Sequence, residues 1–88
     1  MDKRSDAEIL RRLCVLAAEQ ASLDPSAVTG DSDFFTDLNF DSLDAVEYTM
    51  KIEDAFDVNI DDQQAQNART CRQALDMLAP LLRAPHAA

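Results

Sequence analysis

Apolar residues recur every three or four positions in three long segments of this chain, a spacing that is typical of amphipathic helices. The first segment covers residues 5–21, the second spans Ser42–Phe56, and the third begins at Thr70. A shorter polar segment over 61–67 predicts a fourth, short helix. The first and third segments each open with a capping box, in which Ser or Thr is followed three residues later by Glu or Gln. Pro80 should kink or end the last helix, because it lacks a backbone N–H.

The stretch between the first two helices, residues 22–40, differs in composition. It is rich in Asp, Ser and Thr and contains Pro25 and the only glycine, Gly30. We expect a long loop with a short helical turn over 31–36. Apolar residues should pin this loop to the core: Leu23, Val28, Phe34, Phe35 and Leu38. The pattern predicts an all-α fold, a small four-helix bundle of three long helices and one short helix, with a long loop between helices one and two. We expect a single domain over 1–88, frayed at 1–4 and 84–88.

The helix predicted over Ser42–Phe56 carries apolar residues on two sides. A broad core face consists of Ala45, Tyr48, Ile52, Ala55 and Phe56, with Thr49 at its margin. A second stripe on roughly the opposite side consists of Leu43, Val46 and Met50, within an acidic rim of Asp44, Glu47, Glu53 and Asp54. A helix buried on one side does not need this second stripe. Another element could cover it, its residues could be scattered exposed apolars, or it could be a small docking patch.

Asp41 and Ser42 mark the start of this helix. Asp41 is well suited to cap it, since its carboxylate can accept a hydrogen bond from a backbone N–H that the helix leaves unpaired. Asp44 adds negative charge in the first turn, where the helix dipole favours it. Ser42 is therefore predicted in the first turn, at the head of the second stripe. A serine in this place could be a cap and nothing more, but Asp41 already suits that role.

Net charge narrows the classes of partner. The chain has 17 acidic and 8 basic residues, for a formal net charge of −9. Nucleic acid and anionic membranes are poor partners for such a surface, and basic protein surfaces are good ones. We find no signal peptide and no apolar run long enough for stable membrane insertion. We expect a cytoplasmic monomer.

Catalytic and metal-binding motifs are missing from the sequence. His86 is the only histidine, and there is no Gly-x-Ser-x-Gly elbow, so a serine hydrolase would lack its usual base and turn. Cys14 and Cys71 do not form a metal-binding motif and should be buried free thiols. Residues 57–61 match the first ligand positions of an EF-hand, but its later glycine and glutamate are absent. We predict neither an enzyme nor a metal site.

A series of short runs resembles one known family. The runs are Asp37-Leu38, Asp41-Ser42-Leu43, Val46-Glu47 and Glu53-Asp54-Ala55-Phe56-Asp57. Together they resemble the acyl carrier proteins of the fatty-acid-synthesis type, and the resemblance extends over essentially the whole chain. It implies that Ser42 carries a covalent 4′-phosphopantetheine arm, with Asp41 and Leu43 beside it in the attachment motif.

The resemblance also implies a function and a set of partners. The chain would hold acyl intermediates as thioesters on the arm and deliver them to enzymes of fatty-acid or related biosynthesis. Expected partners are a phosphopantetheinyl transferase and acyltransferases, ketosynthases and other acyl-processing enzymes with basic docking patches. The implied docking surface consists of Asp41, Leu43, Asp44, Val46, Glu47, Met50, Glu53 and Asp54. Two alternatives stay open: a specialised carrier for polyketide, lipid-modifying or aminoacyl chemistry, and a helical interaction module without a prosthetic group.

Some residues depart from the family's usual pattern. Members that carry acyl chains often shelter them between the helices. Tyr48 and Thr49 stand where fatty-acid carriers generally have aliphatic residues, and Ala68 stands where a larger apolar residue is common. The hydroxyl groups of Tyr48 and Thr49 could narrow or partly wet the interior, so the identity and length of the acyl cargo stay open. Asn39 replaces a usual glycine, and Asn tolerates a positive φ.

Overall fold

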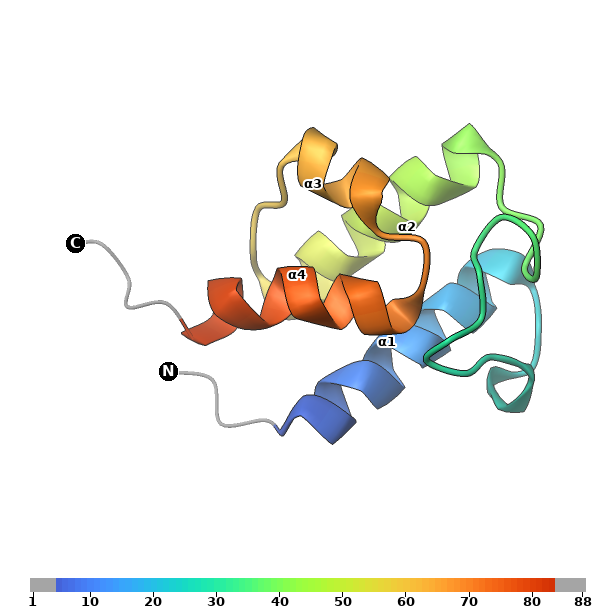
Figure 1. Cartoon of the computed structure of the whole chain (residues 1–88), viewed down its shortest axis with the longest axis horizontal. Helices are drawn as coiled ribbons and strands as arrows, with labels where there is room; N and C mark the ends of the chain where they lie inside the picture. Colours follow the sequence, from blue (N-terminus) through green and yellow to red (C-terminus); the bar gives the residue numbers. More distant parts are fainter. Residues whose placement is uncertain (1–4, 84–88) are drawn as a thin grey trace.

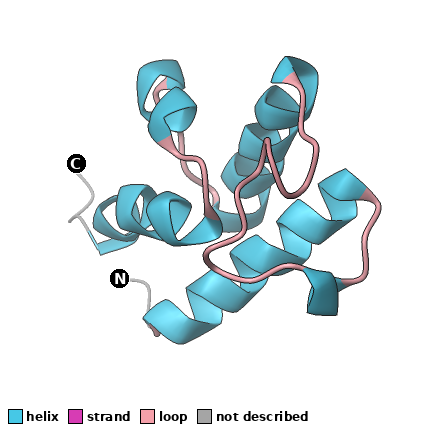
Figure 2. Ribbon diagram, turned by 45° about the vertical axis from the view of Figure 1, so that its right-hand side comes forward, coloured by secondary structure: helices cyan, strands magenta, loops and turns pink. Residues whose placement is uncertain are grey.

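The computed structural model describes residues 5–83, which form helices and connecting loops without a strand in that range (Figures 1 and 2). The elements are α1 (Asp6–Ala21), the 3₁₀-helix η1 (Pro25–Ala27), α2 (Ser42–Phe56), α3 (Asp62–Asn67) and α4 (Cys71–Arg83). The predicted all-α bundle of three long helices and one short helix is confirmed. The short helix η1 was not predicted. The segments 1–4 and 84–88, for which we predicted fraying, lie outside the described residues.

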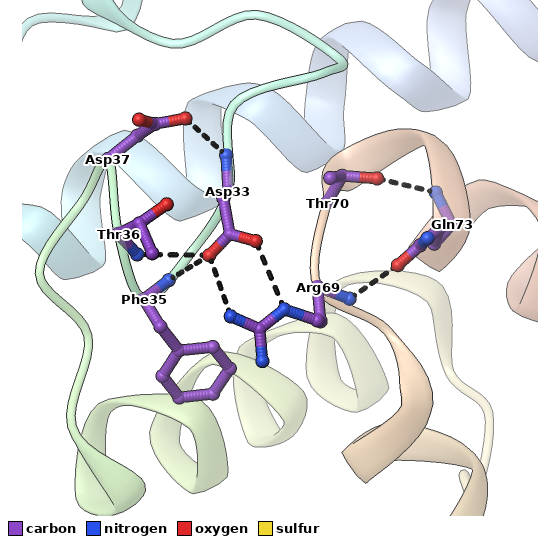
Figure 3. Close-up of polar contacts among 7 residues, drawn as sticks. All are labelled: Asp33, Phe35, Thr36, Asp37, Arg69, Thr70 and Gln73. Atoms are coloured by element: carbon purple, nitrogen blue, oxygen red, sulfur yellow. Dashed lines mark hydrogen bonds and ion pairs between the residues drawn. The ribbon is translucent and has the colours of Figure 1, made fainter.

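Each of the four α-helices begins after a side chain that accepts a hydrogen bond from a first-turn N–H. These capping residues are Ser5, Asp41, Asp61 and Thr70, at N···O distances between 2.8 and 3.2 Å. The box predicted at Thr70 is only half formed, because the Gln73 side chain accepts from the N–H of Arg69 at 2.7 Å and not from that of Thr70 (Figure 3). Local capping chemistry therefore sets where the helices begin.

The core lies where α1, α2 and α4 bring their apolar faces together. The helices contribute Ile9, Leu13 and Leu16 of α1, Tyr48, Ile52 and Phe56 of α2, and Leu75 and Leu78 of α4. The predicted core face of α2 is wrong at Ala55, which is exposed, and Ala45 is half-buried. Ala55 lies two turns after Tyr48 on the same side of the helix. It lies about 60° around the helix from Ile52, at the edge of the buried face, and that edge is left uncovered.

The loop between α1 and α2 is pinned to the core as predicted, except at its start. Val28, Phe34 and Leu38 are buried, and Phe35 packs against the core. Leu23 is exposed, contrary to the prediction. Its backbone N–H bonds to the Ala18 carbonyl and helps to end α1, and its side chain is left outside.

The helical turn predicted over 31–36 is a single turn placed slightly later in the chain. The N–H of Asp37 donates to the carbonyl of Asp33 at 2.9 Å, and no helix extends from this turn. The loop then reaches α2 through Asn39, whose φ of 59° confirms the predicted positive-φ role. Asn39 therefore supplies a conformation that few other side chains adopt readily.

Two ion pairs and two backbone hydrogen bonds fasten this loop to the segment around the start of α4. The ion pairs join Asp33 to Arg69 at 3.0 Å and Asp31 to Arg72 at 2.9 Å. The N–H of Phe34 donates to the Arg69 carbonyl, and that of Arg72 donates to the Gly30 carbonyl. Figure 3 shows Asp33 between Arg69 and the loop N–H groups that it caps. The loop is thus held along its length despite having little helix of its own.

The last helix continues past its proline. Of the two outcomes predicted for Pro80, a kink or an end, the end does not occur, because α4 runs on to Arg83. Pro80 has no N–H to donate to the carbonyl of Asp76, four residues earlier. Both residues are exposed, so water can reach that carbonyl. Arg83 forms an ion pair with Asp6 of α1, which joins the start of α1 to the end of α4.

Candidate functional site

Ser42 is the first residue of α2, and its side chain is exposed. Asp41 caps the helix, as predicted, by accepting the N–H of Asp44 at 2.8 Å. The serine is therefore not used as a cap. Among the residues that the structure describes, none forms a hydrogen bond with the Ser42 hydroxyl. The result is an accessible hydroxyl at a well-defined helix end.

The first turn of α2 is held more firmly than the sequence indicated. Asp44 returns the capping bond by accepting the N–H of Asp41 at 3.1 Å, which completes a capping box built from two aspartates. Gln20 of α1 donates to Asp44 at 2.8 Å and to Glu47 at 3.3 Å. The backbone N–H of Asp41, followed by the Gln20 amide, lowers the pKa of the Asp44 carboxyl. Asp44 thus stays charged at neutral pH.

Gln20 was not among the predicted site residues. It lies in the last turn of α1, 24 positions before Asp44. A glutamine near a helix end carries no local signal for such a contact, which depends on how α1 and α2 pack. Its amide braces two of the acidic residues that we placed on the docking surface.

The second apolar stripe of α2 is open to solvent, which excludes the interpretation that another described element covers it and leaves the other two. Leu43, Val46 and Met50 have exposed fractions of 64%, 57% and 61%. Ser42 is next to Leu43, and the spacing of three and seven residues from Leu43 keeps all three side chains on one side of the helix. Met50 lies about 12 Å along the axis from Ser42. No other described element covers the stripe.

The acidic residues around this stripe differ in their freedom. Glu47 and Asp54 are exposed. Glu53 is half-buried and accepts the N–H of Ile60 at 2.8 Å, which ties the α2–α3 connector to α2. Part of its hydrogen-bonding capacity is therefore used inside the protein. Asp54 and Glu47 are the more available charges for a partner.

A shallow groove of about 580 Å³ adjoins the stripe at the C-terminal end of α2. Met50 and Val58 supply apolar surface there, and Asp54 and Asp57 supply negative charge. Asp57 has a φ of 55°, which turns the chain so that Val58 comes back alongside α2. The sequence did not place Asp57 or Val58 in the site, because that placement depends on this turn.

Within residues 5–83, no side chain forms a hydrogen bond through which it could take the proton of the Ser42 hydroxyl. The neighbouring carboxylates of Asp41 and Asp44 are engaged in the capping box, and His86 lies outside the described residues. A phosphate ester on Ser42 would fit the site. The hydroxyl is accessible, and the positive end of the α2 dipole favours phosphate charge at this position.

Comparison with known proteins places the chain in a family. The sequence model described as "Phosphopantetheine attachment site" matches residues 11–78. An acyl carrier protein of Thermosynechococcus vestitus is 39% identical over 74 residues, covering 84% of this chain and 91% of that protein. One of Phaeodactylum tricornutum is 46% identical over 67 residues, covering 76% of this chain and 88% of that protein. The chain belongs to the acyl carrier protein family.

This membership agrees with the resemblance stated from the sequence, and it identifies the prosthetic group. An acyl carrier protein has a covalently attached 4′-phosphopantetheine and is a carrier without catalytic activity. A third relative, from Prochlorococcus marinus, is 40% identical over 74 residues, covering 84% of this chain and 92% of that protein. The chain thus spans nearly the whole length of these relatives.

The remaining sequence predictions concern thiols, metals and membranes. Cys14 and Cys71 are both free thiols, and Cys71 is buried, but Cys14 is only half-buried. Within residues 5–83, no group of three or more His, Cys, Asp or Glu side chains is arranged to hold a metal ion. In the same range, no helix combines the length and the apolar character needed to cross a membrane.

Proposed function

We propose that Ser42 of this acyl carrier protein bears the 4′-phosphopantetheine arm, and that the protein delivers arm-bound acyl intermediates to enzymes of fatty-acid or related biosynthesis. The observation that carries the proposal is the exposed, unbonded hydroxyl at the first position of α2, directly beside the open stripe of Leu43, Val46 and Met50. When attached, the arm supplies a thiol that holds an acyl group as a thioester.

The protein's own residues position the attachment point. Asp41 and Asp44 fix the first turn of α2, and Gln20 ties that turn to α1. Ser42 is thereby presented at a fixed place on the surface, where a transferase can reach it. The serine oxygen would bond to the phosphorus next to the pantetheine of coenzyme A, the pyrophosphate bond would break, and adenosine 3′,5′-bisphosphate would leave. Because Ser42 has no base of its own in the described chain, the transferase must remove the hydroxyl proton.

The docking surface that we propose combines the open stripe with its acidic rim. It consists of Asp41, Leu43, Asp44, Val46, Glu47, Met50, Glu53 and Asp54. Negative charge around a small apolar patch steers partners with basic patches and speeds their encounter more than it slows their release. The phosphopantetheinyl transferase, acyltransferases and ketosynthases would share this surface in turn. Such short-lived complexes suit a carrier that must leave one enzyme for the next.

The test is the intact mass of the protein before and after incubation with coenzyme A and a broad-specificity phosphopantetheinyl transferase. We expect the parent protein to gain one phosphopantetheine and Ser42→Ala to gain none. Ser26→Ala, which removes another exposed serine at the start of a short helix, is the matched control and should gain one. Modification of a folded Ser42→Ala protein, or none of the folded and unmodified parent, would disprove the assignment.

The alternatives from the sequence lead to different outcomes. An interaction module without a prosthetic group would keep its partner affinity in Ser42→Ala, but a carrier would lose its activity with the fold intact. A specialised carrier would also accept modification, and the acyl groups that its partner enzymes load onto the arm would distinguish it from a fatty-acid carrier. The cytoplasmic location and the monomeric state stay predictions.

A further inference from the structure

The interior of the bundle contains a small cavity beside α2. It lies between α2, α3 and α4 and has a volume of about 20 Å³. Tyr48, Thr49 and Phe34 line it together with Met77 and several alanines. A space of this size holds about one water molecule, and a cavity that admits benzene needs on the order of 150 Å³. An acyl chain of more than a carbon or two does not fit in the space present.

Tyr48 is held in place by several contacts. Its hydroxyl donates to the Leu13 carbonyl at 3.0 Å in a buried hydrogen bond. The edge of its ring packs against Phe34 and Phe40, with centroids 4.9 and 5.8 Å away, and these two phenylalanines stack on each other. Turning the ring aside would break the hydrogen bond and both aromatic contacts, and buried acceptors are costly to leave unpaired.

The buried side-chain polar atoms near the cavity already have hydrogen-bond partners within the protein. The Thr49 hydroxyl donates to the Ala45 carbonyl at 2.9 Å. Within residues 5–83, every buried side-chain nitrogen or oxygen has a hydrogen-bond partner. The inner side of α2 is therefore satisfied as it stands, without room or unmet bonding for a guest.

We propose that Tyr48 is a specificity-determining residue, which closes the interior of the bundle to acyl chains so that the cargo stays outside the protein. This inference rests on the proposed attachment at Ser42. An apolar chain on the arm gains free energy only where it can leave water, and the interior offers no such place. Outside the bundle, the chain would meet only the open stripe and the shallow groove beside Met50. The protein therefore suits short or polar acyl groups better than long alkyl chains.

The first test uses the unmodified protein and does not depend on the arm. Benzene is titrated into the protein, and backbone amide shifts are followed by NMR. The parent should show no saturable shifts. Tyr48→Ala, or Tyr48→Leu if the alanine variant does not fold, should show saturable shifts at Ala65, Ala68 and Met77. Phe56→Leu alters an equally buried ring of α2 that does not line the cavity, and it should behave like the parent at those three residues.

The second test uses the loaded protein. The thermal unfolding midpoint is measured with acyl groups from acetyl to decanoyl on the arm. In the parent, the midpoint should not change with chain length, whereas in Tyr48→Leu it should rise as the chain grows. Saturable benzene binding by the parent, or a parent midpoint that rises steadily with chain length, would overturn the inference.

The two proposals fail separately. If no arm can be attached at Ser42, the proposed function is wrong, and the benzene titration still decides whether Tyr48 closes the interior. If the arm attaches and the parent shelters a decanoyl chain, Ser42 keeps its assignment and only the role of Tyr48 is lost.

Discussion

The guanidinium of Arg69 donates two hydrogen bonds to the carboxylate of Asp33, at 3.0 and 3.3 Å, across 36 positions of the chain. The same carboxylate accepts the N–H groups of Phe35 and Thr36, and Arg69 also lies over the Phe35 ring. One aspartate thus shapes its own loop and joins that loop to the start of α4. The N–H of Thr36, then the Arg69 side chain, lower the pKa of Asp33 from 3.8 to about 2.

This relationship predicts a loss of stability in acid. The folded protein holds the Asp33 proton less tightly than the unfolded chain does. The contribution of Asp33 to the free energy of unfolding is therefore present above pH 3.8 and is lost as the pH falls towards about 2. Urea unfolding of the parent and of Asp33→Asn at several pH values checks this. The parent should be the more stable at neutral pH, and the difference should shrink across that window. A difference that persists unchanged at low pH would contradict the prediction.

The effect of the capping hydrogen bond of Asp41 on stability can be separated from the effect of its charge. Asp41→Ala should lower the free energy of unfolding by about 1 kcal/mol, the usual cost of a lost N-cap. Asp41→Asn keeps an acceptor oxygen for the N–H of Asp44, so it should lower the free energy of unfolding by only about a few tenths of a kcal/mol. Chemical denaturation measures both effects. If the two variants lose the same stability, charge and not the hydrogen bond would be the important property of Asp41.

The acidic rim should act on encounter rates. Asp54→Lys changes an exposed rim charge beside the groove and should lower kcat/KM for the transferase by roughly tenfold at low ionic strength. The loss should fade as salt is added, because screening shortens the reach of exposed charges. Asp76→Lys makes the same change in net charge on an exposed residue of α4, so it controls for overall charge. Equal losses in both variants would mean that the rim has no special place in docking.

Alkaline solution should destabilise the fold through Cys71. Burial, followed by the nearby Cys14, raises the pKa of the Cys71 thiol from 9.0 to about 12. The folded protein retains this proton when the unfolded chain loses it, so stability falls as the pH rises from 9 to about 12. The slope approaches about 1.4 kcal/mol per pH unit for each retained proton. Urea unfolding under reducing conditions should give a shallower decline for Cys71→Ala than for the parent, and parallel curves would refute this.

The helices and the place of Ser42 at the exposed start of α2 were predictable because their signals are local. Asp41 caps α2 and the stripe of Leu43, Val46 and Met50 repeats at helical spacing, so both could be read within one short segment. Gln20 and Val58 reach the site only after α1 packs beside α2 and the chain turns at Asp57. No spacing rule reports such contacts. The prediction for Ala55 failed for a related reason, since it lies at the edge of the apolar face of α2, and whether that edge is covered depends on how the other elements pack.

The ion pair between Asp6 and Arg83 has a practical consequence for handling the protein. It brings together the start of α1 and the end of α4, and both lie away from the start of α2 (Figure 1). A bead, fluorophore or solid support joined to the chain before Asp6 or after Arg83 would therefore be anchored on the side remote from Ser42. Protein immobilised in this way would keep the Ser42 hydroxyl facing the solution, which suits surface-based tests of the proposed transferase reaction.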